Sequence, residues 1–322
     1  MSAPFDLITM GRVGVDVYPD QVGVGLEDVT SFGKYLGGSA TNVAVAAARL
    51  GHRTAVITRT GEDPFGRFIH RALQRFGVDD RWVNAVVHLP TPVVFCEIFP
   101  PDDFPLYFYR LPTAPDLQIR PDELDYDAIR SARVFWVTLT GLSSSPSREA
   151  TLAALEARGR RGPTVLDLDY RPMFWANEEE AAIQAAAALK QVTVAVGNRD
   201  ECRVTVGETE PTAAAAALHA AGVELAVVKQ GPAGVLGSSS AGQVVVSPVP
   251  VDVVNGLGAG DAFGGALAHG LLRGTDLKTT LTLANAAGSY VAGQLACADA
   301  MPDLAQLTDY LHQHETQKDG PR

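Results

Sequence analysis

Short apolar runs rich in β-branched residues alternate with stretches of helical composition along most of this chain of 322 residues. This alternation is typical of a mainly parallel sheet with helices on both faces, because parallel strands need a crossover between them. The predicted strands are residues 7–10, 55–58, 134–139, 165–168, 192–196, 225–228 and 244–246. The predicted helices are residues 42–50, 149–158, 178–190, 212–221 and 261–273, several of them followed by a terminating glycine. The pattern therefore predicts a single α/β domain over residues 1–322.

Two segments interrupt the alternation. Residues 13–35 and 91–110 are each expected to form short strands joined by turns, and neither has room for a crossover helix. We expect the two excursions to form a small β-rich lid on the α/β core. The polar residues 313–322 are expected to form a frayed tail.

The net charge and the cysteines indicate which classes of partner the protein can bind and in which cellular compartment it is expected. The 26 basic and 37 acidic side chains give a net charge of −11, which argues against a broad basic face for nucleic acid. An anionic substrate would need local arginines, backbone amides or a metal ion. No basic-then-apolar leader and no long apolar span occurs, so we expect no membrane partner. Cys96, Cys202 and Cys297 lack CxxC spacing, which favours buried thiols in a cytoplasmic protein.

The strongest chemical signal is the glycine-rich run at residues 255–263, which leads directly into an amphipathic helix. The backbone N–H groups of Gly258, Ala259 and Gly260 can converge there as an anion hole for a transferring phosphoryl group. Asp261 at its mouth can orient a hydroxyl and accept its proton as the phosphoryl group leaves ATP. The helix N-terminus predicts a lowered pKa for Asp261. The alternative is a capping aspartate after a glycine turn, and neither GxxxxGK[ST] nor GxGxxG is present.

A second glycine motif precedes the alanine-rich helix near residue 43. Gly37 and Gly38 would let a substrate approach the backbone closely, and Asn42 offers a donor and an acceptor to sugar hydroxyls. The alternative is an ordinary helix N-cap.

These two motifs together resemble the two signatures of the ribokinase-like (PfkB) carbohydrate kinases. Residues 37–51 with Gly61 downstream are similar to the first signature, and residues 258–261 to the second, in the family's order. The similarity spans essentially the whole chain. It implies a three-layer α/β/α sandwich with a mainly parallel central sheet, a β-rich lid that closes on the sugar, and ATP and Mg²⁺ as cofactors.

The resemblance assigns roles to further residues. Asp16 resembles the family's lid-proximal aspartate, which binds substrate hydroxyls. The alternative interpretation is that Asp16 is only a polar residue at the end of a strand. Asn198 and Glu201 resemble the NxxE motif that organises Mg²⁺ through water, in keeping with the preference of Mg²⁺ for oxygen ligands. Their alternative is a helix cap.

The nucleotide side is implied by two weaker matches. Lys229, Gly231 and Gly234 resemble the family's nucleotide-side glycine turn, and Asn285 resembles the helix residue near adenine. Residues 255–257 depart from the family pattern, because asparagine, glycine and leucine replace the usual acid and hydroxyl. This departure leaves Asp261 unaffected and supports no inference about a monovalent cation.

Two arginines suggest an acidic sugar. Arg110 ends a predicted lid strand and Arg171 follows a core strand, and guanidinium groups bind carboxylates through paired hydrogen bonds. The alternatives are surface or interdomain salt bridges for both, and contact with the ATP phosphates for Arg171.

Further segments narrow the predicted substrate. Within the family, residues 31–38, 145–150, 168–172 with Trp175, and 300–302 resemble kinases of myo-inositol catabolism. The resemblance implies phosphorylation of the 6-hydroxyl of 5-dehydro-2-deoxy-D-gluconate. Open alternatives are 2-keto-3-deoxygluconate, a neutral sugar as in fructokinases or ribokinases, and a catalytically silent sugar- or nucleotide-binding regulator. Exposed lid strands also suggest a homodimer.

Overall fold

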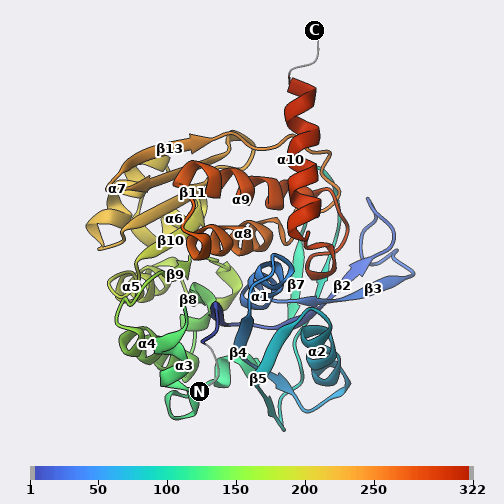
Figure 1. The fold of residues 1–322 in the computed structure, drawn as a ribbon. Helices are drawn as coiled ribbons and strands as arrows, with labels where there is room; N and C mark the ends of the chain where they lie inside the picture. The colour runs from blue at the N-terminus through green and yellow to red at the C-terminus, as the bar shows by residue number, and fades with distance from the viewer. Residues whose placement is uncertain (1–3, 319–322) are drawn as a thin grey trace.

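A computed structural model describes residues 4–318 and contains one large sheet of nine strands (Figure 1). Their order is β13-β12-β11-β10-β9-β8-β1-β4-β5. The strands from β11 to β5 in that order are parallel, and β12 and β13 form an antiparallel edge. The bounds are β1 Leu7–Met10, β4 Thr54–Gly61, β5 Val78–Val86, β8 Val134–Thr138, β9 Thr164–Asp167, β10 Val194–Asn198, β11 Leu225–Lys229, β12 Val235–Ser239 and β13 Gly242–Val246.

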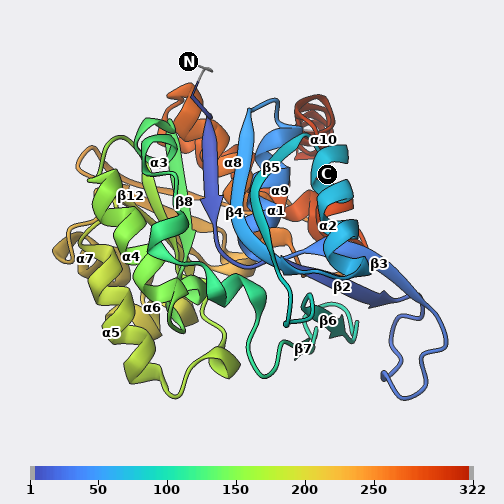
Figure 2. The ribbon, with the colours of Figure 1, turned by 90° about the horizontal axis from the view of Figure 1, so that it is seen from below.

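Helices cover both faces of this sheet (Figures 1 and 2). One face packs against α1 (Ser39–Arg49), α2 (Pro64–Arg75), α8 (Ala259–Arg273), α9 (Leu277–Ala292) and α10 (Leu304–Lys318). The other face packs against α3 (Tyr126–Ser131), α4 (Ser147–Arg158), α5 (Glu178–Leu189), α6 (Arg199–Val206) and α7 (Pro211–Ala220). Short 3₁₀ turns lie at Pro115–Gln118, Pro121–Glu123, Leu139–Leu142, Pro172–Phe174, Gly231–Ala233 and Ala298–Ala300.

The central strands β1, β8 and β9 are buried along their whole length and are mainly apolar, because helices cover both faces of the sheet. In β8, Trp136 packs into the core beneath α1 and α8, and its neighbour Phe135 packs into the core beneath α4. Successive side chains of a strand point to opposite faces, so one apolar run serves both cores. The predicted three-layer α/β/α sandwich is confirmed.

A smaller sheet of four strands projects from this core, in the order β3-β2-β6-β7 (Figure 2). Its strands are β2 (Gly14–Pro19), β3 (Phe32–Gly37), β6 (Val93–Cys96) and β7 (Leu106–Tyr109). They come from the two segments that interrupt the sequence alternation. Strands β2 and β6 are parallel and join the two excursions side by side.

Several elements differ from the sequence prediction. Strand β5 was not predicted because it is a polar edge strand, and β12 was missed because its second half is small and polar. Strand β10 runs to Asn198, two residues beyond the predicted end. Residues 313–318 of the expected frayed tail continue helix α10, in which Tyr310 packs edge-on against Tyr290 of α9. Residues 319–322 lie outside the described residues.

Candidate active site

Several predicted site residues lie at the edge where the parallel strands end, among them Asn198 at the end of β10 and Lys229 at the end of β11. The carboxyl ends of parallel strands lie at one edge of a sheet, where they meet the N-termini of the helices that follow. A Cβ placed on Gly11, just after β1, would lie 2.8 Å from the Thr138 hydroxyl of β8 and 3.0 Å from the Ala40 Cβ of α1. Strands β1 and β8 and helix α1 therefore converge tightly here.

The glycine-rich run forms a concave loop at the start of α8. Gly258 has φ of 80°, and a Cβ there would lie 2.6 Å from Cys297 Sγ, so both conformation and space require glycine. The first helical hydrogen bond runs from Ala262 N–H to Gly258 O, and no side chain caps the helix. The preceding N–H groups are thus free to bind an anion. A Cβ on Gly260 would lie 3.4 Å from Lys229 Nζ, so this cation is close to the loop.

Asp261 lies in the first turn of α8 and accepts a hydrogen bond of 2.8 Å from Asn42 Nδ2. Burial raises its pKa to about 6, Asp169 adds to the rise, and Asn42 and Arg12 oppose it. The lowered pKa that the helix N-terminus predicts is wrong, because desolvation outweighs the helix dipole. A carboxylate with this pKa is mostly ionised at neutral pH and is a stronger base than an ordinary aspartate.

Opposite charges surround the loop. Lys229 ends β11, and although burial alone would lower its pKa, Glu201, Asp167 and Asp261 raise it, so the ammonium stays charged. Asp167 ends β9, and burial with nearby acids raises its pKa to about 8, against the attraction of Lys229. Asp167 and Asp169 were missed in the sequence, although acids directly after a buried strand are a signal for this edge of a parallel sheet.

Asn198 and Glu201 form a reciprocal cap at the start of α6. Asn198 Oδ1 accepts from Glu201 N at 2.9 Å, and Glu201 Oε2 accepts from Asn198 N at 2.6 Å. The helix-cap alternative therefore describes their local geometry. Among the described residues, no cluster of three or more His, Cys, Asp or Glu side chains could hold a metal ion. This donor set fits Mg²⁺ bound mainly by phosphates and water, with Glu201 nearby.

The smaller sheet brings Asp16 to the same region. Asp16 lies in β2, and a Cβ on Gly37, at the end of the adjacent strand β3, would lie 2.1 Å from Asp16 Oδ1. Burial raises the pKa of Asp16, although the Tyr18 hydroxyl donates to it at 2.7 Å. Gly38 precedes α1, where a Cβ would lie 2.5 Å from the Arg12 carbonyl oxygen. The structure thus brings Asp16, Gly37 and Gly38 together beside α1.

The two predicted arginines are held by different carboxylates. Arg110 forms an ion pair of 2.9 Å with Asp116, and their side chains are only 8% and 3% exposed. Arg171 lies 3.0 Å from Asp169 Oδ1. The salt-bridge alternative therefore describes the contacts of both arginines. A third arginine, Arg12, was missed, although its place just after β1 is a signal for this edge.

The predicted nucleotide-side residues lie next to β12 and β13. A Cβ on Gly234 would lie 2.1 Å from the Val246 carbonyl oxygen, so this glycine permits close packing of the β12–β13 hairpin. Gly231 begins the turn after Lys229. Asn285 of α9 donates from Nδ2 to the Val246 and Ser247 carbonyls at 3.2 and 3.1 Å. The contacts of Gly234 and Asn285 hold the β12–β13 hairpin and the segment after it in place. The nucleotide-binding roles of Gly231, Gly234 and Asn285 stay predictions.

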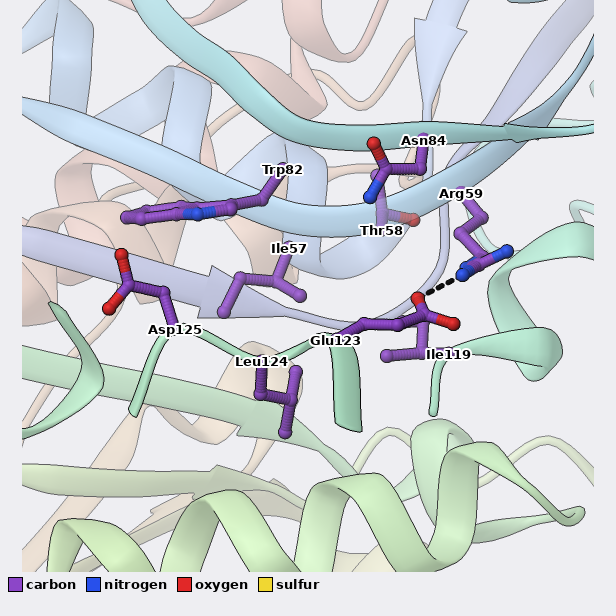
Figure 3. Close-up of a pocket in the computed structure, with 9 residues that line it drawn as sticks. All are labelled: Ile57, Thr58, Arg59, Trp82, Asn84, Ile119, Glu123, Leu124 and Asp125. Carbon is purple, nitrogen blue, oxygen red and sulfur yellow. Dashed lines mark ion pairs between the residues drawn. The ribbon is translucent and has the colours of Figure 1, made fainter. Parts of the chain in front are cut away.

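A separate pocket lies between β4, β5 and residues 119–125, away from these residues (Figure 3). The Arg59–Glu123 ion pair closes one side of it, and its volume is about 10 Å³. That space admits at most a single water molecule. Within residues 4–318, no helix has the length and apolar character needed to cross a membrane.

Known proteins similar to this chain are carbohydrate kinases and related sugar kinases. The model of the pfkB family of carbohydrate kinases matches residues 5–304. A 5-dehydro-2-deoxygluconokinase of Geobacillus kaustophilus is 34% identical over 318 residues, which cover 97% of this chain and 95% of that protein. The aminoimidazole riboside kinase of Salmonella enterica, solved with its riboside and an ATP analogue, is 26% identical with a TM-score of 0.77 over 95% of this chain and 99% of that one. The ATP-bound fructokinase of Xylella fastidiosa shares the fold, with 22% identity and a TM-score of 0.84 over 96% and 99% of the two chains.

Proposed function

Because this chain belongs to the pfkB family of carbohydrate kinases, we propose that it uses ATP to phosphorylate the 6-hydroxyl of 5-dehydro-2-deoxy-D-gluconate in myo-inositol catabolism. The observation that carries the chemistry is Asp261, a carboxylate with a pKa of about 6 beside the free N–H groups at the start of α8. The choice of sugar is supported by the nearly full-length likeness to 5-dehydro-2-deoxygluconokinases.

Asp261 is the general base of this proposal. It accepts the proton of the 6-hydroxyl as that oxygen attacks the γ-phosphorus, while the bond from phosphorus to the ADP oxygen breaks. The N–H groups of the 258–260 loop and the Lys229 ammonium stabilise the charge on the transferring phosphoryl oxygens. Mg²⁺, held near Asn198 and Glu201 partly through water, would supply positive charge to the phosphates. Movement of the smaller sheet over the sugar would exclude water and favour transfer over hydrolysis.

The sugar is proposed to lie between the smaller sheet and α1. Asp16 and Asn42 would hydrogen-bond its hydroxyl groups, and the bare backbone at Gly37 and Gly38 would allow close approach. Arg171, 36% exposed beside Asp169, remains available to a carboxylate or to the ATP phosphates.

An Asp261→Asn variant tests the catalytic step. The amide keeps the shape of the side chain and cannot accept a proton, so kcat should fall by roughly 10²- to 10⁴-fold. The dissociation constant for ATP, measured by calorimetry, should stay close to the wild-type value. Asp122→Asn, at an exposed surface position, is the matched control. Near-normal turnover by the Asp261 variant would remove this residue as the base.

A substrate panel separates the alternatives. ADP release is measured with 5-dehydro-2-deoxygluconate, 2-keto-3-deoxygluconate, fructose and ribose at equal concentrations. The proposal expects the highest kcat/KM with the first. Preference for the second would make the chain a 2-keto-3-deoxygluconate kinase, and preference for fructose or ribose would indicate a neutral-sugar kinase. Binding of ATP and keto acid without ADP release would identify a silent regulator.

Two further predictions concern the protein's surroundings. We propose a homodimer through the smaller sheet, where Phe32 and Tyr109 are exposed, and sedimentation velocity measures it directly. A cytoplasmic location is supported by Cys96, Cys202 and Cys297, which are all free and buried.

A further inference from the structure

Arg12 is a mostly buried arginine whose guanidinium makes no hydrogen bond to the described residues, although it forms a long ion pair with Asp169. Its side chain is only 11% exposed, and Nε is buried with no partner. Within residues 4–318 the structure gives this guanidinium two contacts. Nε lies 3.7 Å from Asp169 Oδ2, too far for a hydrogen bond, and the guanidinium carbon lies 5.7 Å from the ring centre of Phe108.

Arg59 and Arg171 also have a buried Nε without a partner, but each holds a carboxylate through Nη2, and Arg158 shows the fully satisfied case. Arg158 is 1% exposed, and its guanidinium donates to the backbone carbonyls of Ile129, Ala132 and other residues at 2.6 to 3.2 Å. Buried polar groups in proteins are nearly always paired in this way, because an unpaired buried charge is costly. The unused donors of Arg12 therefore point to a ligand.

The position of Arg12 fits a substrate contact. It follows β1 at the strand edge that carries the site, and its positive charge opposes the rise in the pKa of both Asp16 and Asp261. Its charge therefore acts on both the predicted sugar-binding acid and the predicted base. Phe108, on strand β7 of the smaller sheet, lies over it and packs against Phe174 at 4.9 Å between ring centres. Arg12 is thus covered by the sheet proposed to close on the sugar.

Arg110 is differently placed. Its guanidinium lies 4.7 Å from the ring centre of Phe174 and donates to Asp116, so a buried partner already compensates its charge. An anionic sugar would meet at Arg12 a guanidinium whose carboxylate neighbour, Asp169, lies 3.7 Å away and is shared with Arg171. At Arg110 it would meet a guanidinium already hydrogen-bonded to Asp116.

We propose that Arg12 is a specificity-determining residue, which binds the carboxylate of an acidic sugar through paired N–H···O hydrogen bonds. This inference rests on the proposed function, because it deepens the choice of an acidic sugar. A neutral sugar of the same length would leave the guanidinium without an anionic partner, so the enzyme would bind it more weakly.

The test compares 5-dehydro-2-deoxygluconate with its neutral analogue, in which CH₂OH replaces the carboxylate. Dissociation constants are measured by calorimetry and kcat/KM by ADP release, for wild type, Arg12→Met, Arg12→Lys and the exposed control Arg120→Met. We expect Arg12→Met to weaken binding of the acid by roughly 30-fold or more, and binding of the neutral analogue by less than about threefold. Arg12→Lys should fall between, because lysine keeps the charge and loses the planar fork.

Three results would overturn the inference. Equal losses for the acid and the analogue would mean that Arg12 acts only through the fold. An Arg12→Lys variant that folds and keeps the full wild-type preference for the acid would deny the paired contact, and this variant decides the matter if Arg12→Met does not fold. Arg110→Met is measured in the same way, and loss of the preference in this variant with Arg12→Met unaffected would assign the carboxylate to Arg110. If wild type itself shows no preference for the acid, the proposed function fails before any variant is compared.

Discussion

The hydrogen bond from Asn42 to Asp261 allows a direct test of how the fold sets the basicity of this carboxylate. Asn42 Nδ2 donates to Asp261 Oδ2 at 2.8 Å, and both side chains lie in the recess between α1 and α8. The bond stabilises the ionised form and so opposes the effect of burial, which raises the pKa to about 6. Substituting Asn42 by Ala removes this opposition without touching the carboxylate itself.

The size of the effect follows from the strength of the bond. A hydrogen bond to a charged group contributes about 1.5 to 3 kcal/mol, and a change of one in pKa corresponds to about 1.4 kcal/mol. The Asn42→Ala variant should therefore raise the pKa of Asp261 from about 6 to between about 7 and 8. At pH 7 the ionised fraction would fall from about nine-tenths to between roughly one-tenth and one-half.

The assay is kcat/KM for the sugar, measured by coupled ADP release from pH 5 to pH 9 at saturating ATP. The acid limb of this profile reports groups of the enzyme before the sugar binds. Because its midpoint does not depend on absolute rate, a loss of sugar affinity in the variant does not obscure it. Asn84→Ala, at an exposed position of β5, serves as control. An acid limb that stays near pH 6 in an active Asn42→Ala enzyme would refute the reasoning.

Two further perturbations test other parts of the structure. Gly37→Ala places a Cβ where the Asp16 carboxylate lies, 2.1 Å from Oδ1, so KM for the sugar should rise at least about tenfold with KM for ATP nearly unchanged, as steady-state kinetics would measure. An unchanged KM for the sugar would separate Asp16 from sugar binding. Burial and the neighbouring His269 lower the pKa of His52 from 6.5 to about 4, so the folded state favours the neutral imidazole. The contribution of neutral His52 to the free energy of unfolding is therefore fully present above pH 6.5 and is lost as the pH falls. Between pH 7 and pH 5 the free energy of unfolding should fall by about 2 kcal/mol through this residue, measured by urea denaturation. His52→Gln should flatten that dependence, and an equal slope in both proteins would contradict the assignment.

Local sequence patterns predict most of the backbone. The apolar β-branched runs locate the central strands, because a strand covered on both faces has no solvent side to mark with polar residues. The pattern fails for β5, whose edge position tolerates Asp79, Asp80 and Arg81. It also fails for α10, because the polar sequence there gives no clear helical pattern. In the structure, Tyr310 of this helix packs against Tyr290 of α9.

Short motifs also predict the residues that form the candidate site, because the glycines at 37–38 and 258–260 are required by the conformation of the local backbone. Motifs do not predict which charged side chains have a hydrogen-bonded partner. Arg110 and Arg12 both follow apolar strands, yet only the folded chain places Asp116 against one and leaves the other without a hydrogen bond. Ion pairing depends on residues that the sequence separates and the fold brings together.

The sequence alone indicated the α/β architecture, the candidate phosphate-binding loop and Asp261 as the candidate base, because each depends on residues adjacent along the chain. Only the tertiary structure decided that the pKa of Asp261 is raised and that the Arg12 guanidinium, 3.7 Å from Asp169, makes no hydrogen bond to the described residues. Both properties depend on the burial and the charges of groups from β1, β9, α1 and α8. These groups come close together only in the folded chain, so no single stretch of sequence reveals them.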